Sequence, residues 1–310
     1  IVYASLFPDD NGKEQLGLMM VSSSGYTFEQ PNIESQESFL AIVEEFREET
    51  SSPASKDKYL ESSQKLYHLL IKPLEAELES QDINTLIFVV DKRIRSLPFS
   101  ALHDGQKFLV EKYSLAMMPG LYLTNTRYKS IKDSKILAFG VSRPQFLPQF
   151  PYLRFVFDEI NNIQEDWHGE FYLDNDATLD KLFSKHQDAD IVHIASHGDL
   201  VRNYPGLDNL EEDAFIGFWD QPLLSSQLEE LDFYSFAKEL LVLSSCNMGL
   251  GDEYGLAGSA IRAGVKSVLG SVNLVDDRAT MLLMSEFYNY LNTGEIKAEA
   301  LRQAQIKMLK

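Results

Sequence analysis

The sequence predicts an α/β fold in which a mostly parallel sheet is flanked by helices. Apolar runs of strand length alternate along the chain with segments whose apolar residues recur at helical spacing, and this alternation is typical of such a sheet. Several runs, residues 240–243 among them, are apolar at successive positions, as expected of a strand buried on both faces. Two of the runs end in side chains capable of chemistry, at the edge where parallel α/β sheets carry their active sites.

The composition is that of an acidic chain of 310 residues, of which 44% are hydrophobic. This length allows one large domain or two modest ones, and the polar stretch 129–134 is the predicted boundary between subdomains over 1–130 and 131–310. The net charge of −19 disfavours nucleic acid as a partner, because its phosphates would be repelled. No apolar run is long enough to span a bilayer, so no membrane partner is expected.

The chain contains a single cysteine, which excludes an intramolecular disulfide framework and a zinc site of the Cys-x-x-Cys type. A free thiol persists in a reducing compartment, so we expect a cytoplasmic protein. We also expect no cofactor and no bound metal. The chain begins at Ile1 rather than at a methionine, and we expect it to be a fragment or a processed form.

The first half is predicted to begin with strands over 1–7 and 15–21, joined by a hairpin-type turn that contains Pro8 and Gly12. Residues 22–34 are predicted to be loop. The other elements predicted in this half are helices at 37–49 and 58–79, with a kink or a new turn at Pro73, a strand at 85–90, short strands at 108–113 and 115–118, and a helix at 121–128.

The second half is predicted to restart the alternation of strands and helices. The proline-rich stretch 142–151 and the acidic stretch 201–214 are predicted to be loops. Thr178 is expected to cap a helix, and Gly264 to end another helix in the left-handed conformation. The remaining predicted elements are strands at 135–141, 171–173, 190–195, 214–219, 240–244 and 266–272, and helices at 155–167, 178–185, 225–231, 256–263, 277–291 and 295–310.

Two of the predicted strands deliver a histidine and the cysteine to the same edge of the sheet. Residues 190–195 lead into His197 and Gly198, and residues 240–244 lead into Cys246 and a Gly-rich turn. A cysteine beside a histidine is an activated nucleophile, because the imidazole takes the thiol proton and the thiolate attacks a carbonyl. The backbone N–H groups at Gly198 and Cys246 are candidates for an oxyanion hole.

Each of these residues has a plainer interpretation on its own. A lone cysteine is often an inert buried residue, and a lone histidine at a strand end is usually a solvated or hydrogen-bonded polar group. His193 and His197 have the spacing of two metal ligands on a helix, but in a strand they stand far apart, so we interpret His193 as a buried, hydrogen-bonded histidine. A Cys-dependent acyltransferase or amidase would use the same Cys–His pair as a protease.

Several stretches, in order and at plausible spacing, carry a family resemblance. They are residues 97–102, 190–198, 241–249, 255–268 and 275–280. Together they resemble the CHAT domain, a caspase-like cysteine peptidase domain that is often attached to tetratricopeptide repeats and is named after caspases and a cyanobacterial heterocyst-differentiation protein. The stretch 190–198 resembles the strand of the family's catalytic histidine, and 241–249 resembles the strand of its catalytic cysteine.

The resemblance implies a caspase-like fold, with a pseudo-caspase-like amino-terminal subdomain over 1–130 and a catalytic subdomain over 131–310. It implies a cysteine endopeptidase (a thiol protease) in which Cys246 is the nucleophile and His197 the general base, with the N–H groups of Gly198 and Cys246 as the oxyanion hole. Members often act as regulated proteases in bacterial signalling or defence. We therefore expect a protein substrate and a regulatory segment, such as a tetratricopeptide-repeat region, as partners.

The chain departs from the family pattern in two places. Asn273-Leu274 stands where many relatives carry Trp-Pro, a pair expected to face the substrate cleft, so the specificity of those relatives does not transfer directly. The chain also stops at Lys310, before the final strand expected of the family, and we expect a truncated carboxyl end.

Acidic residues near the two strand ends predict a pocket for a basic residue before the scissile bond, because carboxylates bind Arg or Lys through charge-assisted hydrogen bonds. For Asp276 and Asp277, the alternative is that one of them caps the following helix. For the chain as a whole, the alternative is a catalytically silent caspase-like scaffold for protein–protein interaction. The acidic candidates are Asp199, Asp252, Glu253, Asp276 and Asp277.

Overall fold

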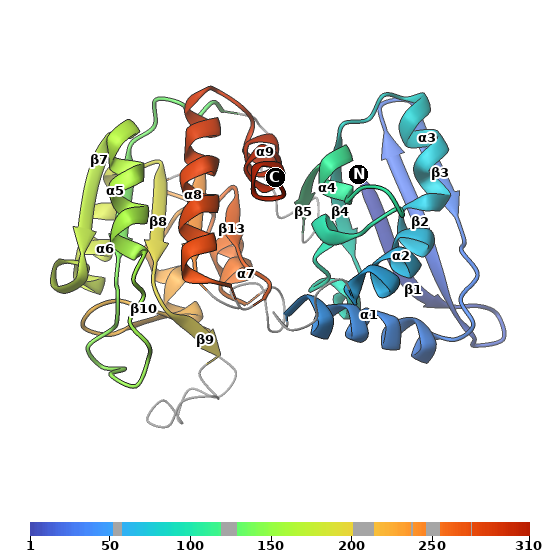
Figure 1. Cartoon of the computed structure of the whole chain (residues 1–310), viewed down its shortest axis with the longest axis horizontal. Helices are drawn as coiled ribbons and strands as arrows, with labels where there is room; N and C mark the ends of the chain where they lie inside the picture. The colour runs from blue at the N-terminus through green and yellow to red at the C-terminus, as the bar shows by residue number, and fades with distance from the viewer. Residues whose placement is uncertain (52–57, 119–128, 201–213, 237, 246–254, 274) are drawn as a thin grey trace. The chain divides into compact units, whose positions relative to one another are not determined.

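The chain forms two compact units, Ile1–Leu121 and Tyr122–Lys310 (Figure 1). Helices pack on a sheet around one apolar core in the first unit and around two in the second, so the predicted α/β fold is confirmed. The structure is a computed structural model, and it describes residues 1–51, 58–118, 129–200, 214–236, 238–245, 255–273 and 275–310.

The first unit contains a mixed sheet, whose described strands have the order β3-β2-β1-β4-β5. β1, β2 and β3 are antiparallel neighbours, whereas β4 lies parallel to β1 and β5 lies parallel to β4. The predicted turn between the first two strands is confirmed, since Gly12 N–H donates to the Asp9 carbonyl at 2.9 Å. The strands are β1 (Val2–Pro8), β2 (Glu14–Ser22), β3 (Gly25–Glu29), β4 (Thr85–Val90) and β5 (Ser114–Met117).

Helices of the first unit pack on this sheet through the predicted apolar positions. Phe39, Val43 and Phe46 of α1 belong to one core with alternate residues of β1 and β2. Pro73 interrupts the long helix as predicted, because α2 ends at Leu70 and a 3₁₀ turn leads into α3. The helices are α1 (Gln36–Ser51), α2 (Tyr59–Leu70), α3 (Glu75–Ser80) and α4 (Leu109–Lys112), with 3₁₀ turns at Lys72–Leu74, Lys92–Ile94 and Phe99–Ala101.

Two predictions for this unit are wrong. The stretch 22–34 contains the edge strand β3, whose aromatic residues Tyr26 and Phe28 are largely exposed, so the strand lacks the pattern of burial that sequence periodicity detects. The predicted strand at 108–113 is the short helix α4, whose first turn is held by a hydrogen bond from Phe108 N–H to the Glu111 carboxylate at 2.7 Å. The helix predicted at 121–128 lies outside the described residues.

The main sheet of the second unit is parallel throughout its described part, with the strand order β13-β12-β8-β6-β7. The predicted parallel sheet is thus confirmed. Every residue of β6, β8 and β12 is buried, which explains why their sequences are apolar at successive positions. The strands are β6 (Ile136–Gly140), β7 (Gly169–Leu173), β8 (Ile191–Ala195), β12 (Leu240–Ser244) and β13 (Val268–Gly270).

Alternate residues of these strands face two different cores. In β8, Val192 and Ile194 belong to the core that holds α6 and α7, whereas Ile191 and Ala195 belong to the core that holds α5, α8 and α9. Figure 1 shows α5 and α8 running side by side over their face of the sheet. The helices are α5 (Val156–Asp166), α6 (Leu179–Lys185), α7 (Gly255–Arg262), α8 (Asp277–Asn292) and α9 (Lys297–Met308), with 3₁₀ turns at Asp174–Asp176, His186–Asp188 and Ser225–Leu231.

A small antiparallel sheet, β11-β10-β9, follows β8 along the chain. The strand predicted at 214–219 ends earlier, at Gly217, and the short neighbours on either side were not predicted, because three residues give no readable period. The helix predicted at 225–231 is a 3₁₀ helix. The strands are β9 (Gly198–Leu200), β10 (Ala214–Gly217) and β11 (Pro222–Leu224).

Two predicted helix caps have different outcomes. Gly264 has φ +106°, and a Cβ there would lie 2.7 Å from the Tyr234 backbone nitrogen, so glycine is required after α7 as predicted. Thr178 precedes α6 as predicted, but its side chain makes no capping hydrogen bond. The Asp220 carboxylate accepts from Leu179 N–H at 3.1 Å instead, a cap supplied by a residue distant in sequence.

Candidate active site

The carboxyl ends of β8 and β12 lie next to each other. The two strands are parallel neighbours in register, with Ala195 opposite Ser244, and Ser196 N–H donates to the Ser244 carbonyl at 3.2 Å. His197 comes two residues after Ala195 in the chain, and Cys246 comes two residues after Ser244. Cys246 itself lies outside the described residues. The register of the sheet therefore places side by side the ends of the two strands that precede the predicted pair in the sequence.

His197 is half-buried, and its ring is held by a backbone carbonyl. Its Nε2 lies 2.7 Å from the carbonyl oxygen of Pro151. Since a carbonyl only accepts hydrogen bonds, Nε2 carries the proton of the neutral ring, and Nδ1 keeps its lone pair. The Phe150 ring packs against the imidazole, with ring centroids 4.6 Å apart. The ring is thus oriented so that Nδ1 is the atom able to accept a proton.

The surroundings of His197 favour its neutral form. Burial lowers the pKa of the imidazole, while the Pro151 carbonyl and the negative charge of Asp277 raise it, and the net effect is a pKa below the usual value. At neutral pH the ring is therefore neutral and able to act as a general base.

The proline-rich segment that carries Pro151 is a closed loop, as its sequence predicts. Leu153 N–H donates to the Ser142 carbonyl at 2.9 Å and closes the loop, while the Asp174 carboxylate accepts from both the N–H and the hydroxyl of Ser142 at 2.8 Å. Inside the loop, Leu147 and Phe150 pack around Phe215 of β10. The contact of this loop with His197 was not predicted, because no local sequence signal marks a backbone carbonyl as a partner.

The acidic candidates fall into different environments. Asp276 is the N-cap of α8 and accepts from Ala279 N–H at 2.9 Å, so the capping alternative is confirmed for this residue. Asp277 accepts from Phe155 N–H at 3.0 Å. Asp199 lies on β9, paired with Phe215, directly after Gly198. Asp252 and Glu253 lie outside the described residues.

His193 lies on β8, the strand that leads into His197, and its side chain is completely buried. Its Nε2 lies 2.9 Å from Oε1 of Glu159 on α5, and its Nδ1 lies 3.1 Å from the hydroxyl of Tyr288 on α8. The predicted buried, hydrogen-bonded histidine is confirmed. Both ring nitrogens are engaged by protein groups, so His193 has a structural role that joins β8 to the two helices covering it.

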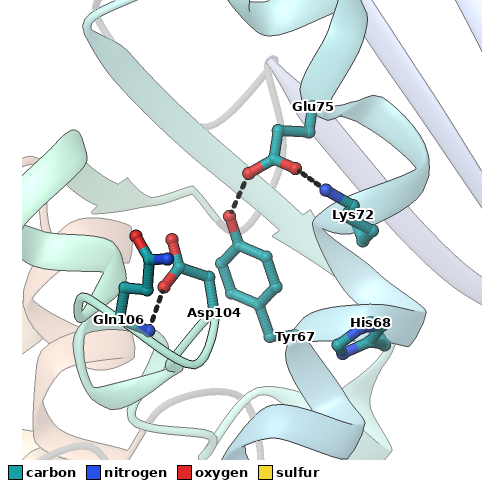
Figure 2. Close-up of a pocket in the computed structure, with 6 residues that line it drawn as sticks. All are labelled: Tyr67, His68, Lys72, Glu75, Asp104 and Gln106. Carbon is teal, nitrogen blue, oxygen red and sulfur yellow. Dashed lines mark hydrogen bonds and ion pairs between the residues drawn. The ribbon is translucent and has the colours of Figure 1, made fainter.

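A polar pocket of about 220 Å³ lies in the first unit, and the sequence did not indicate it. Figure 2 shows the Tyr67 hydroxyl and the Lys72 ammonium bound to the two oxygens of Glu75. Lys112 donates to Glu75 Oε1 at 2.8 Å, to Asp104 Oδ2 at 3.0 Å and to the Tyr67 hydroxyl at 3.0 Å. The lining residues are Tyr67, His68, Lys72, Glu75, Asp104 and Gln106.

The acids of this pocket are held in their charged form. Burial alone would raise the pKa of Glu75, but hydrogen bonds from Lys112, Lys72 and Tyr67 outweigh it and lower this pKa to about 2. For Asp104, burial is likewise outweighed, by backbone N–H groups and by Lys112, and its pKa is also about 2. Both values lie below those of the unfolded chain, so the stabilisation is present above about pH 5 and is lost as the pH falls towards 2.

Lys112→Met is expected to destabilise the first unit by about 2 kcal/mol at pH 7, because it removes the cation shared by two partly buried carboxylates. The loss should shrink as the pH falls towards 2, where the carboxylates become protonated in both proteins. Thermal unfolding followed by circular dichroism at several pH values measures the difference. Trp167 and Trp219, the two tryptophans, belong to the second unit, so tryptophan fluorescence reports on the unfolding of that unit. A fluorescence melt that shifted as much as the dichroism melt would contradict the prediction that Lys112 stabilises the first unit.

The parallel sheet, with a histidine after β8 and a cysteine after the neighbouring β12 in sequence, is consistent with a caspase-like fold. Comparison with family models agrees: the model of the CHAT domain matches residues 60–310. The chain belongs to the CHAT domain family, a caspase-like peptidase family.

Other comparisons add little to this assignment. No curated protein matches the chain. Among solved structures, the crystal structure of protein GSU0716 from Geobacter sulfurreducens is similar to part of the chain, with 17% identity and a TM-score of 0.27. The match covers 36% of this chain and 50% of that one, so it spans half the length of that structure. In the described part of the chain, the helices are too short or too polar to cross a bilayer.

Proposed function

We propose that the chain is a cysteine endopeptidase in which Cys246 is the nucleophile and His197 the general base, acting on a protein substrate in regulatory proteolysis. One observation carries the proposal: Nε2 of His197 is bound to the Pro151 carbonyl, which leaves the Nδ1 lone pair for the thiol proton. The register of β8 and β12 supports it, since the residues after these strands share one edge of the sheet.

The chemistry follows from these positions. Nδ1 of His197 removes the thiol proton, and the thiolate attacks the carbonyl carbon of the scissile peptide bond. The N–H groups of Gly198 and Cys246 are proposed to bind the oxyanion of the tetrahedral intermediate. When the C–N bond breaks, the Nδ1 proton passes to the leaving amine and an acyl-enzyme remains. His197 then deprotonates a water molecule, which attacks the thioester and releases the acid and the free thiol.

A basic residue is proposed before the cleaved bond. Asp276 and Asp277 both accept backbone N–H groups at the start of α8. We propose that Asp199 and Asp252, two of the other candidates, contribute to the pocket. Asp199 lies on β9, two residues after His197 in the chain. A carboxylate at this place would bind an Arg or Lys side chain of the substrate.

Labelling of the single cysteine tests the proposal. The chain is treated with peptidyl electrophiles that end in Arg or in Asp, and intact mass reports the modification of Cys246. We expect fast labelling by the Arg-ended reagent, slower labelling by the Asp-ended one, and no labelling of Cys246→Ser. Asp199→Asn should narrow the difference between the two reagents by roughly tenfold, since it removes one charged partner of the basic side chain. Equal and slow labelling by both reagents would favour the catalytically silent scaffold instead.

A further inference from the structure

Asp277, the first residue of α8, contacts the segment whose Pro151 carbonyl binds the His197 ring. Its Oδ2 accepts a hydrogen bond from Phe155 N–H at 3.0 Å, across 122 residues of chain. Phe155 precedes α5 directly and comes shortly after Pro151 in the chain. The carboxylate therefore fixes the end of the segment whose Pro151 carbonyl orients the imidazole.

Two hydrogen bonds anchor the segment that follows the Pro151 carbonyl. The closure of the loop, from Leu153 N–H to the Ser142 carbonyl, joins the segment to the end of β6. The bond between Phe155 and Asp277 joins it to α8. The first anchor sets the shape of the loop, and the second sets where the loop ends relative to the helix that packs beside α5.

Asp277 also acts on His197 through its charge. Of the charged groups in the described residues, it is the one that raises the pKa of His197, and it does so against the larger effect of burial. Its neighbour Asp276 carries the same charge at the same helix terminus, yet it only caps the helix. The two acids therefore differ in what they contact, although a sequence-level interpretation treats them alike.

We propose that Asp277 is the positioning residue of this site: it anchors the Pro151 segment through Phe155, and this segment orients the imidazole that accepts the Cys246 thiol proton. The part that concerns Cys246 rests on the proposed peptidase function. The anchoring of the loop and the effect on His197 do not depend on it.

The experiment separates the hydrogen bond from the charge. Asp277→Asn keeps an oxygen that accepts from Phe155 N–H but loses the charge, whereas Asp277→Ala loses both. Asp276→Asn is the matched control, because it removes one charge from the same helix terminus and retains a capping side chain. The His197 ring is titrated by NMR in protein with ¹⁵N-labelled histidine, with its signal assigned from His197→Gln. Hydrogen exchange over residues 150–156 reports the anchor.

We expect Asp277→Asn to lower the pKa of His197 and Asp276→Asn to leave it in place. Alkylation of Cys246 by iodoacetamide at pH 7 should slow roughly threefold in Asp277→Asn, because a lower pKa makes the His197 imidazole a weaker base. Exchange over 150–156 should accelerate in Asp277→Ala alone. An equal change in the pKa of His197 in Asp277→Asn and Asp276→Asn would overturn the proposal. Unchanged hydrogen exchange over 150–156 in Asp277→Ala would also overturn it. If Cys246 stays unreactive in every variant, the peptidase function fails, and the titration and exchange still decide the role of Asp277.

Discussion

Replacement of His197 by alanine is expected to slow the labelling of Cys246 by an Arg-ended peptidyl electrophile by about 10²–10⁴-fold, the range typical of a lost general base. The imidazole is neutral because burial keeps its pKa below the usual value, and its Nδ1 lone pair is available because Nε2 is bound to the Pro151 carbonyl. Without the ring, the proposed base is lost, and only the small ionised fraction of the thiol is expected to react.

The matched control is His168→Ala, which removes an exposed histidine of the same unit. Intact mass over a time course gives both rates, and circular dichroism shows whether each variant is folded. A His197→Ala variant that remains folded and labels within threefold of the unsubstituted chain would contradict the assignment of His197 as the base. The same loss in His168→Ala would mean that labelling reports on fold integrity rather than on the base.

The sheet could be predicted from the sequence because each buried strand carries its own signal. β6, β8 and β12 are apolar at every position or nearly so, since both of their faces are covered, and the residues after β8 and β12 could be read directly. The small antiparallel sheet could not be predicted in the same way. Its strands β9 and β11 have three residues each, and their pairing depends on neighbours supplied by other segments.

The partners of His197 could not be predicted because they are distant in the chain and are not marked by residue type. The Pro151 carbonyl is separated from His197 by 46 residues, and it is a backbone group that any residue would supply. Asp277 was identified as a candidate, but for the substrate pocket, because sequence shows that an acid is present and not what it contacts. The structure shows that its carboxylate accepts a hydrogen bond from Phe155 N–H.

Replacement of His193 by leucine is expected to destabilise the second unit by about 3 kcal/mol. The change leaves the carboxyl of Glu159 and the hydroxyl of Tyr288 without the ring that bridges them, in a core where both are almost completely buried. Urea unfolding followed by tryptophan fluorescence measures the effect in this unit alone. Trp167 is a direct probe, since its ring packs edge-on against Tyr288 at 5.5 Å.

The loss of stability should come from the buried polar groups left without a hydrogen-bond partner rather than from lost packing. Two further variants separate these causes. Glu159→Gln keeps an oxygen that accepts from Nε2, so a smaller loss of about 1 kcal/mol is expected. The double variant His193→Leu with Glu159→Leu removes the stranded carboxyl, and it should be more stable than His193→Leu alone. A double variant that is no more stable than His193→Leu alone would show that packing dominates. The bridge from β8 to α5 and α8 would then contribute through shape alone, not through its hydrogen bonds.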